Sequence, residues 1–280
     1  MKSIWKLLLI ALLSGCATLA SETEPAGDPP GRIVDLRSGA MLQPAQLLRQ
    51  LADTPRLLVG EKHDNREHHR IERWLATELA ARRPQGSVLL EMLTPSQQAK
   101  VEQAQAGLRA GQSWSGEALA QAVDWQPGWP WPLYGKLAEH LLRAPYPLLA
   151  ANLDRNEMQA VYRSQVQLPG QASTRPEVRA KLSELIREEH GGELKAEHLA
   201  SMLAVQQARD RRMAERLLAA PAPALLIAGA YHAAADIGVP LHVRDLQPQA
   251  PLRVLILAEE GMKLDARQGD YAWFVAPARP

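Results

Sequence analysis

Two apolar runs that each end in ionisable side chains constrain the fold of this 280-residue chain most strongly. Leu57 to Val59 leads into Gly-Glu-Lys-His at residues 60–63, and Leu225 to Ala228 leads into Gly-Ala-Tyr-His at residues 229–232. Short apolar runs of this kind are typical of buried strands in a parallel sheet. Because ligands of such sheets bind outside the carboxyl ends of the strands, we expect the two motifs to converge on one site.

Strand-like and helical segments alternate through the first half of the chain. Strands are predicted at residues 56–60, 87–92 and 147–152. Helices are predicted at residues 44–52, 95–110 and 133–143, with another that Asp64 or Asn65 caps and that ends before Pro84. This alternation predicts an α/β fold with a mostly parallel central sheet, flanked by helices and joined by right-handed crossovers.

The second half begins with a long stretch that lacks strand patterns. Helical spacing runs through residues 179–190 and 197–219, so residues 154–220 are interpreted as an inserted helical lid over the sheet. Further strands are predicted at residues 224–229, 241–243, 252–257 and 271–275, which would complete a mixed sheet.

The N-terminus has the pattern of an export signal. Lys2 and Lys6 flank the start of an apolar segment that is too short to span a membrane, and Leu-Ser-Gly-Cys at residues 13–16 resembles the lipobox of bacterial lipoproteins. We therefore expect residues 1–15 to be removed, Cys16 to be lipidated, residues 16–31 to form a flexible tether, and residues 32–280 to form the domain. Ala17, being other than Asp, favours delivery to the periplasmic side of a Gram-negative outer membrane.

Charge and cysteine content exclude several classes of protein. The chain has 32 basic and 31 acidic residues, and loss of the two lysines in residues 1–15 leaves a formal charge of −1. Nothing in this balance indicates a nucleic-acid partner. Cys16 is the single cysteine, so its lipidation leaves no thiol for a disulfide, a zinc thiolate site or a nucleophile.

Four ionisable residues at predicted strand ends define a candidate pocket. Glu61 and His63 point to the same side of an extended chain, Glu91 follows the apolar residues 88–90, and His232 arrives from the distant strand. Two carboxylates and two imidazoles are able to bind a divalent metal or to serve as general acid and base.

Several short motifs occur in the order found in one known family. They lie at residues 60–65, 89–92, 151–153, 207–214, 228–232 and 238–240. Together they resemble the ChaN family of iron-regulated haem-binding lipoproteins, in a superfamily that also holds erythromycin esterases and Tiki metalloproteases. The resemblance implies an α/β sheet with a helical lid and, for the ChaN branch, haem bound beside an outer-membrane receptor that serves iron uptake.

The other branches of the superfamily imply a different activity for the same pocket. An esterase would use the four pocket residues for hydrolysis, with a histidine activating water, and a metalloprotease would bind a divalent metal through Glu61, His63, Glu91 and His232. Because a tethered haem carrier explains the lipobox better than a tethered hydrolase does, we prefer haem binding and keep hydrolysis as the alternative.

The way haem would be held is only partly defined by the sequence. No Cys-x-x-Cys-His motif is present, so any haem is bound non-covalently, as a b-type haem. The resemblance implies a tyrosinate iron ligand and a histidine supplied across a face-to-face homodimer. Candidate iron ligands are Tyr162, Tyr134 and Tyr231, of which Tyr231 departs from the family pattern; candidate haem contacts are His190, His198 and Arg209.

Overall fold

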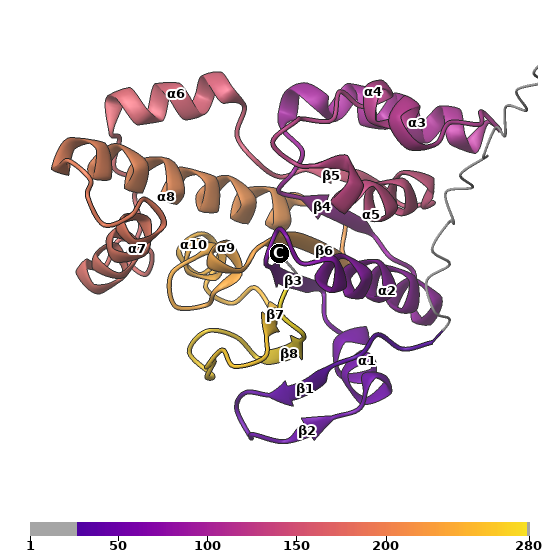
Figure 1. Cartoon of the computed structure of the whole chain (residues 1–280), viewed down its shortest axis with the longest axis horizontal. Coiled ribbons are helices and arrows are strands. Elements are labelled where there is room, and N and C mark those ends of the chain that lie inside the picture. The colour runs from indigo at the N-terminus through magenta and orange to yellow at the C-terminus, as the bar shows by residue number, and fades with distance from the viewer. Residues whose placement is uncertain (1–26, 279–280) are drawn as a thin grey trace, which may run out of the picture.

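The computed structural model describes residues 27–278, which form an eight-stranded sheet with helices on both faces (Figure 1). The strand order is β2-β1-β8-β7-β3-β6-β4-β5, and all neighbours from β8 to β5 are parallel. The strands are β1 (Arg32–Asp35), β2 (Met41–Leu42), β3 (Arg56–Glu61), β4 (Ser87–Leu90), β5 (Leu148–Ala150), β6 (Ala224–Gly229), β7 (Arg253–Glu259) and β8 (Tyr271–Val275). The predicted mostly parallel sheet flanked by helices is therefore confirmed.

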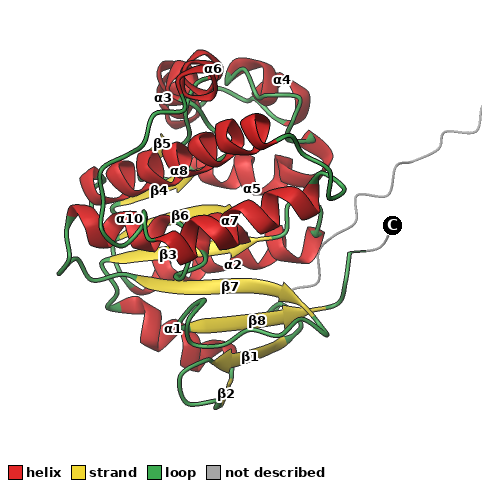
Figure 2. Ribbon diagram, turned by 90° about the vertical axis from the view of Figure 1, so that its left-hand side faces the viewer, coloured by secondary structure: helices red, strands yellow, loops and turns green. Residues whose placement is uncertain are grey.

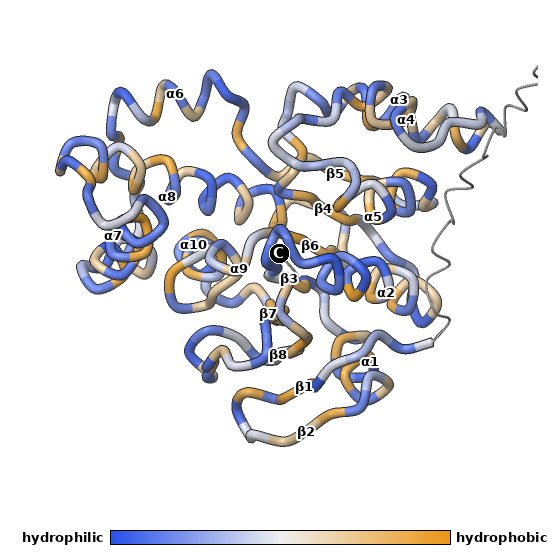
Figure 3. The backbone as a smooth tube through the Cα atoms, in the orientation of Figure 1, coloured by the Kyte–Doolittle hydropathy of each residue, from blue (hydrophilic) through white to orange (hydrophobic). Residues whose placement is uncertain are grey.

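One face of the sheet is covered by helices from the first half of the chain. These are α1 (Pro44–Ala52), α2 (Arg66–Arg82), α3 (Gln98–Arg109, after a 3₁₀ turn at Pro95–Gln97), α4 (Gly116–Ala122) and α5 (Trp131–Arg143). Leu57 and Val59 of β3 pack into this layer, whereas Leu58 packs into the opposite one, because successive side chains of a strand point to opposite faces. Orange and blue positions alternate along α1, as an amphipathic helix requires (Figure 3).

The opposite face is covered by helices from the second half of the chain. These are α6 (Arg155–Ser164), α7 (Pro176–Glu189), α8 (Ala196–Ala219), α9 (Ala230–Ala233) and α10 (Val239–Leu246). In Figure 2, α7, α8 and α10 lie in front of the strands, and α2 and α5 lie behind them. Val178 and Leu182 of α7 share a small separate core with Leu203 of α8 and Leu241 of α10. This core holds α7 over the carboxyl edge of the sheet.

The predicted strand at residues 241–243 is wrong, since these residues lie within α10. Gly238 precedes the helix and Pro240 occupies its first turn, where proline is already in the helical backbone geometry. The segment is buried from Val239 to Val243, so its continuous apolar character did not distinguish a buried helix from a strand. The antiparallel hairpin of β1 and β2 was not predicted, because Ile33 is its only buried side chain.

Two further features concern the membrane. Within residues 27–278, no helix is both long and apolar enough to cross a bilayer. The expected export signal and Cys16 lie outside the described residues.

Candidate functional site

The carboxyl ends of β3, β6 and β4 meet at one edge of the sheet. Glu61 is the last residue of β3 and pairs in register with Gly229 of β6, while Glu91 directly follows β4 on the other side of β6. His232 lies three residues beyond Gly229, in α9. The four residues predicted from the sequence line a cavity of about 600 Å³.

The first half of the site is organised around Glu61, which is 1% exposed. One of its oxygens, Oε1, lies 2.8 Å from His63 Nδ1 and accepts a hydrogen bond of 2.8 Å from the hydroxyl of Tyr134. Its other oxygen, Oε2, lies 2.6 Å from His69 Nε2. Burial raises the pKa of Glu61, but its close contacts with His63 and His69 outweigh it and lower the pKa to about 2. Glu61 is therefore an ionised carboxylate at neutral pH.

His63 is the part of this cluster that faces solvent. Its side chain is 42% exposed, and its ring meets Trp129 edge-on with the centroids 4.9 Å apart. Burial lowers the pKa of His63, while the hydrogen bond to Glu61 and the charge of Glu91 raise it, and the net effect is a raised pKa. The imidazole thus tends to carry positive charge at the cavity wall.

The second half of the site is organised around the buried carboxylate of Glu91. It pairs with the guanidinium of Arg209, accepts a 2.7 Å hydrogen bond from the backbone of Gly229, and lies 3.5 Å from His232 Nε2. Asn152 links this group together, because its amide donates to the Glu91 carbonyl and its oxygen accepts from Arg209 Nε. Burial raises the pKa of Glu91, but the charges of His232 and Arg209 lower it overall.

His232 is oriented from behind by a buried acid. Its Nδ1 lies 2.5 Å from Asp210 Oδ1, and the side-chain nitrogen of Gln206 is 3.1 Å away. An ionised carboxylate only accepts hydrogen bonds, so Nδ1 carries a proton and Nε2 faces Glu91 at the cavity. A histidine held in this way has the arrangement of a general base in a hydrolase.

Glycine is required at position 229 because the two halves of the site approach each other there. A Cβ atom on Gly229 would lie 2.8 Å from His63 Nε2 and 3.6 Å from Glu91 Oε2. The first distance is closer than side chains tolerate, whereas the second is an ordinary contact.

Replacing Gly229 by Ala is therefore expected to displace the ring of His63 without unfolding the protein. His63 would lose its contact with Glu61, at a cost of about 1 kcal/mol, and its pKa would fall from its raised value. An NMR titration of the His63 ring would measure this change. An unchanged titration midpoint in the variant would contradict the assigned packing.

The three candidate tyrosines occupy different environments. Tyr231 is 47% exposed and lines the cavity, Tyr162 is 37% exposed on α6 and lies outside the cavity lining, and Tyr134 is 1% exposed. The hydroxyl of Tyr134 is occupied by its hydrogen bond to Glu61. Burial and then the charge of Glu61 raise the pKa of Tyr134, and burial also raises that of Tyr231.

The candidate haem contacts also differ in whether they line the cavity. Arg209 lines the cavity and pairs with Glu91. His190 follows the end of α7 with its Nδ1 2.8 Å from the carbonyl of Ile186, and His198 lies exposed in the first turn of α8. Neither histidine is part of the cavity lining.

Three residues of the site were not identified from the sequence: His69, Glu72 and Asp210. His69 and Glu72 share one face of α2 with the buried residues Ala76 and Leu79, at a spacing of three and four residues. The presence of ionisable residues on an otherwise apolar helix face is the sequence signal that could have identified them. Burial and the nearby Glu61 raise the pKa of Glu72 well above its ordinary value.

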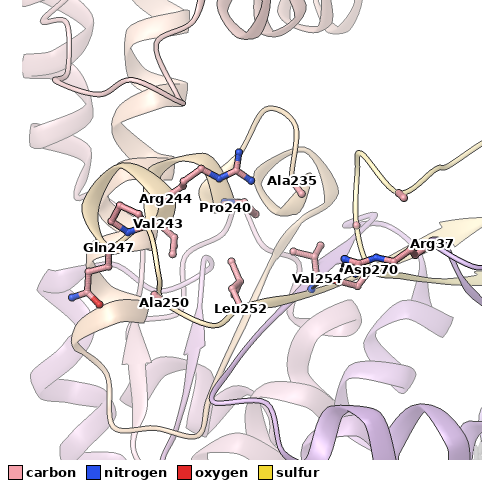
Figure 4. Close-up of a pocket in the computed structure, with 13 residues that line it drawn as sticks. Arg37, Ala235, Pro240, Val243, Arg244, Gln247, Ala250, Leu252, Val254 and Asp270 are labelled. Atoms are coloured by element: carbon pink, nitrogen blue, oxygen red, sulfur yellow. Dashed lines mark hydrogen bonds and ion pairs between the residues drawn. The ribbon is translucent and has the colours of Figure 1, made fainter.

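A second, smaller cavity of about 290 Å³ lies beside α10 and the start of β7 (Figure 4). Its lining includes Arg37, Arg244 and Asp270 together with Val243 and Leu252. None of the four predicted pocket residues lines it, and no histidine does, so the cavity at the ends of β3, β4 and β6 is the candidate functional site.

The fold and the site together define an α/β protein whose candidate cavity lies at the carboxyl ends of parallel strands and is also lined by residues of α7 and α8. Residues 47–243 match the family model described as haem-binding uptake, Tiki superfamily, ChaN. The chain therefore belongs to this family, which confirms the resemblance found in the sequence.

One solved structure agrees with this assignment. The chain is similar to ChaN of Campylobacter jejuni, described as showing cofacial haem binding, with 27% identity and a TM-score of 0.80 over 87% of this chain and 96% of that one. An erythromycin esterase mutant in its open conformation is a more distant match, with 11% identity and a TM-score of 0.49 over 88% of this chain and 83% of that one. Among curated proteins, none matches this chain.

Proposed function

We propose that this protein binds haem non-covalently in the cavity at the carboxyl ends of β3, β4 and β6, and that it serves haem-iron uptake from the outer membrane. The observation that carries this proposal is the similarity to ChaN of Campylobacter jejuni, a protein that binds haem cofacially, over 87% of the chain. A cavity of about 600 Å³ lies in the same place as the predicted pocket. This volume is within the range of about 300 to 1,000 Å³ that is usual for small-molecule and cofactor sites.

The lining of the cavity suits a haem. A porphyrin requires apolar walls, and Leu182, Ile186 and Leu257 supply them. Propionates require cations, which are available from Lys62 and Arg209. Both cations are partly exposed in their present ion pairs, at 44% and 21% of the side chain, so they are able to turn toward a ligand.

Tyr231 is the proposed iron ligand. It combines solvent exposure with a position on the cavity wall, whereas Tyr134 is buried against Glu61 and Tyr162 lies outside the lining. Burial raises the pKa of Tyr231, with a further contribution from Glu189 and Glu188. A ferric ion offsets this by favouring the phenolate, as bound cations lower the pKa of their ligands.

A homodimer would complete such a site. Tyr231 and Met262 are exposed by 47% and 49% although both belong to the cavity lining, so a haem held here would keep an uncovered apolar face. A second protomer placed face to face would cover that surface and remove it from water.

The N-terminal sequence supports a location for this function. The lipobox-like residues 13–16 and the tether at residues 16–31 would hold the domain on the periplasmic side of the outer membrane through the acylated Cys16. From that position the protein would receive haem from an outer-membrane receptor.

A haemin titration of a chain that begins at Ser21, and so retains every described residue, tests the proposal. We expect a saturable shift of the Soret band, a high-spin tyrosinate spectrum and a change from monomer to dimer. Replacing Tyr231 by Phe should weaken haemin binding by about tenfold or more and abolish the tyrosinate spectrum, since an axial bond is lost. The matched control Tyr162→Phe should bind as the unaltered chain does. Weak, non-saturable binding would contradict the proposed function, and an unaltered spectrum in Tyr231→Phe would contradict the ligand.

Hydrolysis is the second candidate function, and the contact between His232 and Asp210 favours it. This pair presents His232 Nε2 toward the cavity beside Glu91, as a general base requires. An esterase and peptidase screen of the haem-free protein tests this candidate. Turnover that disappears in His232→Ala would establish it, and the absence of turnover in the unaltered protein would exclude the substrates screened.

A further inference from the structure

A cluster of three ionisable side chains lies beneath the cavity, between β3 and α2. It consists of Glu61, His69 and Glu72, all of which are buried. One ligand atom from each residue can be chosen such that all lie within 4.8 Å of one another. Among residues 27–278, the predicted pocket residues form no such group of three, because they are arranged as the pairs Glu61 with His63 and Glu91 with His232.

The polar atoms that face the centre of this cluster have no hydrogen-bond partners. Both carboxylate oxygens of Glu72 are without one, although the residue is fully buried. Glu61 Oε2 and His69 Nε2 lie 2.6 Å apart, but they are not oriented to form a hydrogen bond. Unpaired buried carboxylate oxygens are costly, so Glu61 Oε2 and the two oxygens of Glu72 require a positive charge or a proton between them.

The orientation of His69 favours a cation over a proton. Its Nδ1 lies 3.1 Å from the carbonyl oxygen of Leu133, which only accepts hydrogen bonds, so Nδ1 carries the ring proton. In a neutral ring, Nε2 then directs a lone pair at the carboxylates of Glu61 and Glu72. With a neutral ring, a proton on Glu72 alone would leave Glu61 Oε2 facing the lone pair of His69 Nε2, whereas a metal ion would satisfy the ligand atoms of all three residues. A backbone carbonyl behind the ring is also the usual arrangement for a histidine that binds metal.

We propose that Glu61 Oε2, His69 Nε2 and the Glu72 carboxylate bind one divalent transition-metal cation, such as Zn²⁺ or Mn²⁺. One imidazole and two carboxylates are ligands that these ions accept, whereas Mg²⁺ and Ca²⁺ prefer oxygen ligands alone. The site shares Glu61 with the wall of the cavity, but it does not depend on the proposed function.

Glu61 connects this metal site to the cavity. Its Oε2 would bind the cation while its Oε1 remains in contact with His63 and Tyr134. The same carboxylate would thus bind the cation on one side and hold two side chains of the cavity site on the other.

Metal content of the full-length protein, purified in detergent, tests the proposal. The protein would be unfolded in chelator, refolded with Zn²⁺ or with Mn²⁺, dialysed, and assayed for bound metal by mass spectrometry. We expect one ion per chain and a metal-dependent rise in the melting temperature. Replacing Glu72 by Gln, which preserves shape but removes a ligand and its charge, should weaken binding by about tenfold or more.

Two kinds of control make the result specific. Glu78→Gln is the same substitution on α2, at a side chain paired with Arg82 near the surface, and it should leave metal content unchanged. His232→Ala should also retain the metal, because His232 belongs to the cavity pair with Glu91. Thermal unfolding in chelator establishes that each variant folds.

Three outcomes would overturn the proposal. They are an unaltered protein that retains no stoichiometric metal, a folded Glu72→Gln variant that binds metal as tightly as the unaltered protein does, and metal that is lost in His232→Ala. A haemin titration of Glu72→Gln provides an independent readout, so failure of the metal site is distinguishable from failure of haem binding.

Discussion

Replacing Glu61 by Gln is expected to lower the free energy of unfolding at neutral pH by about 3 kcal/mol, at 1.36 kcal/mol per unit of pKa difference. The pKa of Glu61 is lowered from 4.5 to about 2 in the folded protein, because its close contacts with His63 and His69 outweigh its burial. The folded pKa lies below the unfolded one, so ionised Glu61 stabilises the fold fully above about pH 4.5. This contribution is lost as the pH falls toward 2.

Urea unfolding of the unaltered protein and of Glu61→Gln at several pH values between neutrality and pH 3 would measure the effect. The stability difference should shrink as the pH falls below the ordinary pKa of a glutamate. Glu78→Gln is the matched control, since Glu78 is partly exposed in a pair with Arg82 and should contribute less than about 1 kcal/mol. A difference for Glu61→Gln that stayed constant across this range would contradict the assigned ionisation.

Removing the carboxylate of Glu91 is expected to destabilise the fold by about 3 kcal/mol or more, as measured when one partner of a buried ion pair is deleted. Glu91→Ala would leave the guanidinium of Arg209, the ring of His232 and the backbone amide of Gly229 without their shared acceptor. The Arg209 side chain is 21% exposed, so water can compensate part of the loss. We therefore expect a destabilisation close to about 3 kcal/mol.

A surface ion pair on α8, the helix that also carries Arg209, provides the comparison for Glu91→Ala. Glu215 pairs with Arg211 at 3.0 Å, and its side chain is 49% exposed. Glu215→Ala should cost less than about 1 kcal/mol, because water replaces the lost contact. Chemical denaturation of both variants gives the two values, and similar losses would show that burial of Glu91 is not what makes its ion pair important.

The sequence predicted the location of the site better than it predicted the contacts between the residues of the site. The apolar runs that end in Gly60 and Gly229 correctly placed Glu61 and His232 at the carboxyl edge of the sheet, because strand ends can be located from local periodicity. The same reasoning failed at Leu241 to Val243, where a buried helix and a buried strand have the same apolar composition.

The local sequence did not predict which of the candidate tyrosines lines the cavity. Tyr134, Tyr162 and Tyr231 were all candidate iron ligands in the sequence, where no motif identified the ligand and Tyr231 departed from the family pattern. In the structure, Tyr134 is buried against Glu61, whereas Tyr231 faces the cavity and Tyr162 lies on α6. The difference arises from helix packing against the sheet, which depends on residues far away in the chain.

The sequence by itself determined the class of fold and the strand ends at which ionisable residues gather, because both depend on the local order of apolar and polar residues. Only the tertiary structure decided which partners these residues meet. Glu61 contacts Tyr134 across 73 positions of the chain, and Glu91 contacts Arg209 across 118. These contacts depend on the strand order β3-β6-β4 and on the crossover helices that pack beside it, and local periodicity contains no information about either.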